Sequence, residues 1–340
     1  MHEAQFNNQL AVVYLARFAE GPKPLAAFIA SYRKHPAGCA HDLVVVRKGF
    51  PDAPTPQDKQ LAALNAHIIS VSDDGFDINA YAAAAQKLPH QRVAFFNTFS
   101  EILADDWLRK LDAAMSRPGV GIAGATGSYE SLHSSMRRVN EGWWRFRNHI
   151  LPLPAAARRV FRTLRKLLPK ALVQKLLTRI VTYFAAGIQS RDPDRVVDPE
   201  FEAYWAKELQ PGGGHEFLNH IQDFPNVHIR TNGFVIDRRM FLDANPGAIV
   251  TKIDSYLFES GPDSLTRQVM RRGLEVVVVG ADGNVYGVDQ WPRSGTFRQG
   301  DQRNLLVSDN QTRAFGSMDG VAKTVYADLT WGGEHEARPV

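Results

Sequence analysis

Five short apolar segments recur in the first part of the chain, and helical patterns separate them. The apolar segments are Gln9–Phe18, Asp42–Val46, His67–Val71, Arg92–Phe96 and Val120–Gly124. The helical patterns between them are Pro22–Lys34, Thr55–Asn65, Ile78–Leu88 and Asp105–Met115. This alternation predicts an α/β fold with a mainly parallel sheet, and ligands bind such sheets at the carboxyl ends of the strands.

The alternation of predicted strands and helices stops after Ser128 and resumes near residue 228. Residues 137–210 are helical, basic and aromatic, with prolines at 152, 154 and 169. A strand is then expected at His228–Asp237, a helix at Asp263–Arg272 and a strand at Leu274–Val279. We therefore predict one α/β domain, formed by residues 1–136 and 215–340, that is interrupted by a basic amphipathic helical insertion at residues 137–214.

The chain has 340 residues, 44% of them hydrophobic, and one cysteine, Cys39. A single cysteine excludes an internal disulfide framework and a multi-cysteine metal cluster, and it suits a reducing compartment. The first residues show no signal-peptide pattern, and no run of about 18 apolar residues is present. We expect a cytoplasmic protein, either free or peripheral on the inner membrane.

The basic residues concentrate in one segment. Residues 142–191 hold eleven of the 40 Lys and Arg residues and no Asp or Glu, which leaves 29 basic and 36 acidic residues elsewhere. Trp143, Trp144 and Phe146 open this segment, and cationic helices with aromatic anchors suit an anionic membrane surface. A helical subdomain or dimer contact is the alternative. No nucleic-acid-binding motif accompanies the charge, so no nucleic-acid partner is expected.

The two motifs after the third and fourth strands carry a resemblance to a known family. Asp73–Leu88 reads DDGFDINAYAAAAQKL, and Asn97–Leu111 reads NTFSEILADDWLRKL. In this order the chain resembles family 2-type glycosyltransferases of the bacterial surface-polysaccharide type, over residues 9–130 and 226–280. The resemblance implies the GT-A fold, a Rossmann-like, mostly parallel twisted sheet flanked by helices. It also implies a nucleotide-sugar donor, bound by residues 1–136, and a glycan or lipid-linked acceptor, bound by residues 215–340.

The chain departs from this family at the end of the fourth strand. There the family has an Asp-x-Asp motif that holds a divalent cation on the donor diphosphate, whereas this chain has Asn97, Thr98, Phe99 and Ser100. Divalent cations prefer anionic oxygen ligands, which these side chains do not supply. We expect a metal-independent site in which basic groups bind the diphosphate, and we assign no metal ligand. A Mn²⁺ or Mg²⁺ ion held elsewhere is the alternative.

Polar side chains at the predicted strand ends are candidates for donor binding. Arginines after the first two strands suit phosphate oxygens, and a carboxylate after the third suits ribose or base N–H groups. Further candidates are polar residues at the start of the strand predicted from residue 228, where apolar residues would be expected. One more candidate lies in the polar tail. The expected donor-binding residues are Arg17, Arg47, Asp74, Asn97, Ser100, His228, Arg230, Asn232 and Arg298. Solvated loop charges and turn residues are the alternative, and Asp77 is expected to cap the following helix.

The stretch Lys252–Gln268 resembles the family segment in which an acidic residue at a helix start acts as general base. Inverting transfer requires a carboxylate that removes the proton of the acceptor hydroxyl. Glu259 is the expected base, with Asp254 as a second catalytic candidate. For the acceptor we expect Ser128, Tyr129 and Glu130, which follow the fifth strand, and Trp291. The tail at residues 282–313 is either a lid over the donor or a segment packed on the sheet.

Together these patterns predict an inverting hexosyl- or deoxyhexosyltransferase of polysaccharide or lipopolysaccharide assembly. Two alternatives stay open. One is a catalytically silent GT-A-like scaffold at the membrane, which the missing Asp-x-Asp motif favours. The other is a nucleotidyltransferase that makes activated sugars, although residues 20–24 match its Gly-rich loop poorly.

Overall fold

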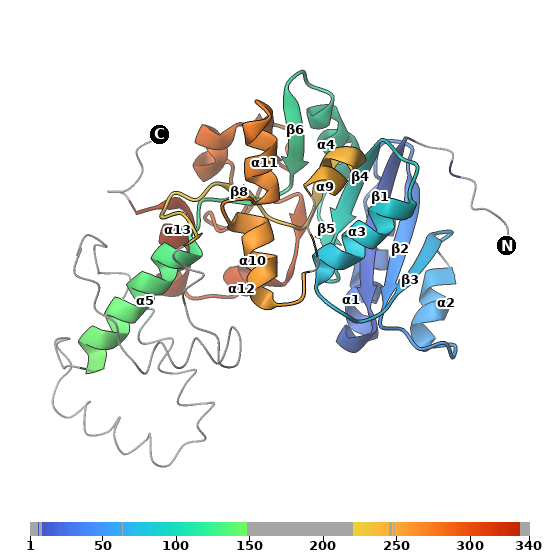
Figure 1. Cartoon of the computed structure of the whole chain (residues 1–340), viewed down its shortest axis with the longest axis horizontal. Coiled ribbons are helices and arrows are strands. Elements are labelled where there is room, and N and C mark those ends of the chain that lie inside the picture. The colour runs from blue at the N-terminus through green and yellow to red at the C-terminus, as the bar shows by residue number, and fades with distance from the viewer. Residues whose placement is uncertain are drawn as a thin grey trace, which may run out of the picture. The chain divides into compact units, whose positions relative to one another are not determined.

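The structure is a computed structural model that describes residues 6, 9–62, 64–147, 220–244, 247 and 249–333. These residues fall into two compact units. Unit 1 contains the described residues up to Tyr129 together with Asn226–Ser317, and unit 2 contains the others. Figure 1 shows the elements of both.

Unit 1 is built on an eight-stranded sheet in the order β11-β10-β6-β9-β4-β1-β2-β3. Its strands are β1 (Leu10–Arg17), β2 (Asp42–Lys48), β3 (His67–Val71), β4 (Arg92–Phe96), β6 (Val120–Gly124), β9 (Phe234–Asp237), β10 (Glu275–Val279) and β11 (Val285–Tyr286). β9 and β11 run antiparallel to their neighbours, and all other pairings in this sheet are parallel. The expected α/β class with a large, mostly parallel sheet is confirmed.

Helices and short strand pairs complete the described elements. In unit 1 these are η1 (Phe18–Glu20), α1 (Pro22–Lys34), α2 (Pro56–Ala62), α3 (Asp77–Lys87), α4 (Trp107–Met115), α9 (Arg238–Asp243), α10 (Lys252–Ser260), α11 (Leu265–Arg271), η3 (Val288–Arg293) and α12 (Asn310–Gly316). β5 (Glu101–Ile102) pairs with β12 (Val307–Ser308), and β7 (Gly127–Ser128) pairs with β8 (His228–Ile229). Unit 2 contributes α5 (Leu132–Arg147) and α13 (Gly320–Trp331).

Helices pack on both faces of the sheet because successive strand residues point to opposite sides. On β4, Phe96 contacts the Trp107 ring of α4 at 5.3 Å between centroids. Its neighbour Phe95 faces the other way, against Tyr81 of α3 at 4.7 Å and Phe241 of α9 at 4.6 Å. All five side chains are fully buried. Two aromatic cores therefore fix the sheet from both sides and hold its carboxyl edge rigid.

The expectation of one continuous strand over His228–Asp237 is wrong. The segment forms two short strands, β8 and β9, which are separated by a loop at residues 230–233. β8 pairs with β7 outside the main sheet, whereas β9 lies between β4 and β6. Gly233 adopts φ +68°, a left-handed conformation that favours glycine, and it turns the chain into β9.

The polar tail at residues 282–313 packs on the sheet. β11 extends the main sheet, and β12 pairs with β5. Trp291 and Phe297 have at most 1% of their surface exposed, so this segment belongs to the core of unit 1. Of the two alternatives, a lid over the donor or a segment packed on the sheet, the structure shows the packed segment.

Unit 2 covers little of the expected insertion. Of residues 137–214, only the last part of α5 is described, so the predicted membrane-binding surface at 142–191 lies essentially outside the described residues. Among the helices that the structure describes, none combines the length and apolar character needed to cross a bilayer.

Candidate functional site

The sheet has a topological switch point between β1 and β4. The chain passes from β1 to β2 and β3 on one side, and then returns to place β4 on the other side of β1. In open α/β sheets a ligand binds outside the carboxyl ends of the strands at such a point. Because β9 is antiparallel, its first residue lies at this same edge. The residues that precede β9 therefore join those that follow β1 and β4.

A charged cluster occupies the ends of β1, β2 and β3. Arg17, the last residue of β1, donates from Nε and Nη2 to the two carboxylate oxygens of Asp73, at 2.8 and 3.1 Å. Its Nη1 lies 3.2 Å from Glu20 Oε1. The hydrogen bonds from Arg17 hold the pKa of Asp73 below its usual value. The pairs are about one-third exposed, so an anionic ligand can compete for this guanidinium.

Lys48 and Asp77 add two ionisable groups to this cluster. Lys48, at the end of β2, has 1% of its surface exposed and donates to the Gly75 carbonyl oxygen at 2.5 Å. Burial lowers the pKa of Lys48. Burial also raises the pKa of Asp77, although the neighbouring Lys48, Arg17 and Lys252 oppose that shift. The expected capping role of Asp77 is wrong, since Phe76 is the N-cap of α3 and no side chain caps it.

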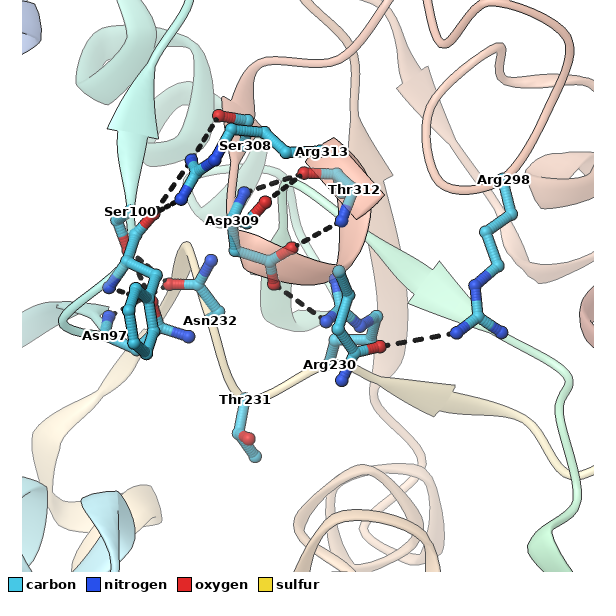
Figure 2. A network of polar contacts seen from close by, with 12 residues as sticks. Asn97, Ser100, Arg230, Thr231, Asn232, Arg298, Ser308, Asp309, Thr312 and Arg313 are labelled. Atoms are coloured by element: carbon cyan, nitrogen blue, oxygen red, sulfur yellow. Dashed lines mark hydrogen bonds and ion pairs between the residues drawn. The ribbon is translucent and has the colours of Figure 1, made fainter. Parts of the chain in front are cut away.

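At the end of β4, Asn97 and Ser100 form a tight turn that Asn232 completes. Asn97 Oδ1 accepts from the Phe99 amide at 3.0 Å. Asn232 Oδ1 accepts from the Asn97 amide at 3.0 Å and from the Ser100 hydroxyl at 2.6 Å. Asn232 and Ser100 are buried. These three expected donor-binding residues are thus brought together, and their present contacts shape the backbone at the switch point (Figure 2).

Three successive residues before β9 contact three different parts of unit 1. Asn232 binds the β4 turn, Thr231 Oγ1 donates to Glu259 Oε2 at 3.0 Å, and Arg230 Nη2 donates to Asp309 Oδ2 at 2.7 Å. These partners lie in the turn after β4, in α10 and at the N-cap of α12. The loop at residues 230–233 therefore joins the groups expected to act on the donor with the carboxylate expected to act on the acceptor.

The ion pair between Arg230 and Asp309 is buried, with side-chain exposures of 8% and 1%. Burial by itself raises the pKa of Asp309, but Arg230 and the Thr312 amide and hydroxyl outweigh it and hold this pKa below its ordinary value. The Arg230 guanidinium also lies over the Phe297 ring at 4.1 Å. Arg298 lies over the same ring at 4.7 Å, and its Nη2 is 3.4 Å from Gln311 Oε1.

Glu259 lies near the end of α10, and Asp254 lies near its start. The resemblance predicted a base at a helix start, and the structure places Glu259 at the opposite end. Asp254 instead forms a capping box with Thr251, accepting from the amides of Val250 and Thr251 at 3.0 and 2.7 Å. Glu259 is therefore the carboxylate that the loop before β9 brings to the edge of the sheet, and Asp254 is engaged in helix capping.

Three further donor candidates lie apart from this network. Arg47 pairs with Asp58 of α2 at 2.9 Å. Asp74 is exposed in the turn after β3. His228 is buried in β8, with its Nδ1 hydrogen-bonded to the Asn226 carbonyl oxygen at 2.8 Å.

The expected acceptor residues of unit 1 are engaged in its fold. Ser128 is buried in β7, and Tyr129 donates its hydroxyl proton to the Val288 carbonyl oxygen. Burial raises the pKa of Tyr129 to about 12. Trp291 is fully buried, with its ring against Gly127, so it is a core residue and offers no platform to an acceptor. Glu130 belongs to unit 2, where it accepts from Ser135 Oγ at 3.3 Å.

Sequence reasoning named Thr231 only as one of the polar residues at 228–232 and Asp309 only as part of the polar tail, and it assigned neither an individual role. Asp309 opens a polar run, DNQ, in the tail, but its partner Arg230 lies 79 residues earlier in the chain. Nothing local in the sequence indicates that pairing.

The end of β4 does not fit a divalent cation. Asn97 Oδ1 and Asn232 Oδ1 already accept hydrogen bonds, and both are neutral oxygens. Within the described ranges, no three His, Cys, Asp or Glu side chains are grouped so that they could hold a metal ion. A hard cation at the end of β4 would therefore lack the anionic ligands that it prefers.

Known structures resemble about one-third of the chain. The mannosyltransferase PcManGT from Pyrobaculum calidifontis, in complex with GDP-Man and Mn²⁺, is 14% identical with a TM-score of 0.30, over 35% of both chains. TarS 1–349 from S. aureus, in complex with UDP-GlcNAc, is 17% identical with a TM-score of 0.27, over 34% of both chains. CMP:2-keto-3-deoxy-manno-octonic acid synthetase with CTP is 16% identical with a TM-score of 0.27, over 34% of this chain and 52% of that one. The chain thus spans about one-third to one-half of the structures that it matches. No protein-family model and no curated protein sequence matches it.

Proposed function

We propose that the chain is a glycosyltransferase that moves a sugar from a nucleotide-sugar donor to a glycan or lipid-linked acceptor. The observation that carries this proposal is the loop before β9. It brings a carboxylate, Glu259, and a buried guanidinium, Arg230, to the carboxyl edge of the sheet beside its switch point. A carboxylate and a cation are the groups that inverting transfer needs, one for the incoming hydroxyl and one for the leaving diphosphate.

In this mechanism Glu259 is the general base. Its carboxylate takes the proton of the acceptor hydroxyl as that oxygen bonds to the anomeric carbon of the donor sugar. The bond between that carbon and the phosphate oxygen breaks, and its electron pair leaves with the nucleoside diphosphate. The Thr231 hydroxyl, 3.0 Å from Glu259 Oε2, orients the carboxylate. The other oxygen, Oε1, is left for the acceptor.

The nucleotide of the donor is proposed to lie along β1–β3. Arg17 faces this edge from β1, and the carboxylates of Asp73 and Asp77 supply acceptors for base and ribose N–H and O–H groups. The exposed Asp74 is a further acceptor at this end.

Two steps test the proposal. The first is the thermal stability of the full chain with UDP-, GDP-, dTDP- and CMP-sugars, because a ligand that binds the native state raises the unfolding midpoint. The second is the rate of sugar transfer or donor hydrolysis by Glu259→Gln. Loss of a general base lowers the rate by roughly 10²- to 10⁴-fold. Donor binding should be retained, since glutamine can still accept from Thr231.

Glu275→Gln is the matched control. Glu275 is exposed at the start of β10, the amino end of a parallel strand, and so it lies at the opposite edge of the sheet. Its replacement should change neither donor binding nor rate. Full activity of Glu259→Gln would refute the base assignment. The absence of a stability shift with every nucleotide-sugar would refute the donor site and favour the catalytically silent scaffold.

A further inference from the structure

The Arg230 guanidinium has more hydrogen-bonding capacity than its surroundings use. Nη2 is paired with Asp309, but Nη1 is buried and has no hydrogen-bond partner among the residues that the structure describes. The residue as a whole is 7% exposed. Buried polar groups are nearly always hydrogen-bonded, and a buried N–H of a charged group without an acceptor costs free energy. The fold keeps such a group at the edge of the sheet where a ligand is expected.

The Asp309 carboxylate does not satisfy the spare N–H. Its Oδ2 accepts from Arg230 Nη2, and its Oδ1 accepts from the Thr312 amide at 2.9 Å. Asp309 therefore fixes the orientation of the guanidinium and leaves Nη1 for another acceptor. A planar guanidinium that is held on one side by a carboxylate is suited to phosphate oxygens on the other.

The loop that covers Arg230 has an unusual backbone. Phe297 lies on the guanidinium, and the loop around it contains Gly295, Arg298 and Gly300 with φ of +69°, +51° and +50°. A left-handed conformation is uncommon for a residue with a side chain such as Arg298. In this conformation Arg298 places a second guanidinium over the ring that covers the first. The glycines on either side allow the loop to shift and admit a ligand to Nη1.

We propose that Arg230 Nη1, together with the Arg298 guanidinium that lies over the same Phe297 ring, binds the diphosphate of the donor in place of a divalent cation. This inference rests on the proposed function for the identity of the ligand, but the anion-binding site itself does not depend on it. The neutral oxygens of Asn97 and Ser100 are poor ligands for a divalent cation. The two guanidiniums supply the positive charge that such a cation would otherwise provide. As the sugar is transferred, they stabilise the negative charge that develops on the leaving diphosphate.

The test is calorimetric binding of inorganic pyrophosphate and of UDP and GDP to the full chain in EDTA. Wild-type protein should bind pyrophosphate and at least one of the nucleotides without a metal. Arg230→Lys keeps a positive charge beside Asp309 but loses the Nη1 group that is proposed to bind the diphosphate. Since a hydrogen bond to a charged group contributes about 1.5–3 kcal/mol, its affinity should fall by about 10- to 150-fold.

Arg92→Lys is the matched control. Arg92 pairs with Asp112 at the same distance, 2.7 Å, but at the amino end of β4, and its replacement should leave binding unchanged. If Arg230→Lys does not fold, the double variant Arg230→Gln/Asp309→Asn removes both charges of the pair, so that neither is left buried alone. It should also lose pyrophosphate binding.

The outcomes separate this inference from the proposed function. Nucleotide binding that requires Mn²⁺ or Mg²⁺, or that is unchanged in Arg230→Lys, overturns the Arg230 site and leaves the transferase proposal to rest on Glu259 and on the nucleotide site along β1–β3. Pyrophosphate binding in EDTA that is weakened in Arg230→Lys, with no stability shift from any nucleotide-sugar of the panel, supports the Arg230 site and overturns the transferase. If neither ligand binds under any condition, both are wrong.

Discussion

Two ion pairs of equal length and different burial allow the energetic role of the Arg230–Asp309 pair to be measured. Arg230–Asp309 and Arg92–Asp112 both have a nitrogen–oxygen distance of 2.7 Å. The first pair has side-chain exposures of 8% and 1%, and the second has 25% and 32%. Replacement of each aspartate by asparagine removes one charge and keeps the shape of the side chain.

The expected costs differ because water can solvate only the exposed arginine. Removing one partner of a buried pair leaves an uncompensated charge and costs about 3–5 kcal/mol. An exposed pair contributes about 0.2–1 kcal/mol. Asparagine at 309 can still cap α12, as asparagine is a good N-cap, so the cap is not lost with the charge. We therefore expect Asp309→Asn to lower the free energy of unfolding by about 3 kcal/mol and Asp112→Asn by less than 1 kcal/mol.

Urea denaturation followed by tryptophan fluorescence measures both variants, since Trp107 and Trp291 are fully buried in unit 1. The pH dependence provides a second check. The pKa of Asp309 lies below its ordinary value, so its contribution to stability is complete well above an unfolded-state pKa of about 3.9. It is lost as the pH falls below that value through the folded-state pKa. The difference between wild type and Asp309→Asn should therefore shrink as the pH falls below about 4. Equal costs for the two variants at pH 7 would refute the role assigned to burial.

Two further predictions concern the edge of the sheet. Asn232→Ala removes the acceptor of the Asn97 amide and the Ser100 hydroxyl, and it should lower the free energy of unfolding in urea denaturation by about 1–3 kcal/mol. Gly127→Ala would place a Cβ 2.6 Å from the fully buried Trp291 ring and should destabilise by about 1–3 kcal/mol in urea denaturation. Its control, a glycine-to-alanine change at position 316 in α12, meets no atom within 4 Å and should be neutral or stabilise by about 0.5 kcal/mol.

The sequence by itself determined the framework of the fold. The strands at Arg92–Phe96 and Val120–Gly124 and the helix at Pro22–Lys34 have the bounds that the pattern predicts. These elements can be predicted from short segments, because burial on one or both sides imposes a hydrophobic periodicity that is visible within about ten residues. Their alternation also predicted the mostly parallel sheet, and hence the edge at which the candidate site lies.

Only the tertiary structure determines how the second half of the chain contributes residues to the carboxyl edge of the sheet. β9 lies antiparallel between β4 and β6, and no local pattern states a strand's neighbours or its direction. The loop before it contacts partners that are 28, 79 and 135 residues away in the chain. Those separations explain why Arg230 and Asn232 could be proposed from their polarity, whereas the partners that they contact could not be predicted. The sequence shows which residues at a strand end are polar. The hydrogen bonds that determine the role of each side chain form only when the sheet brings distant segments together.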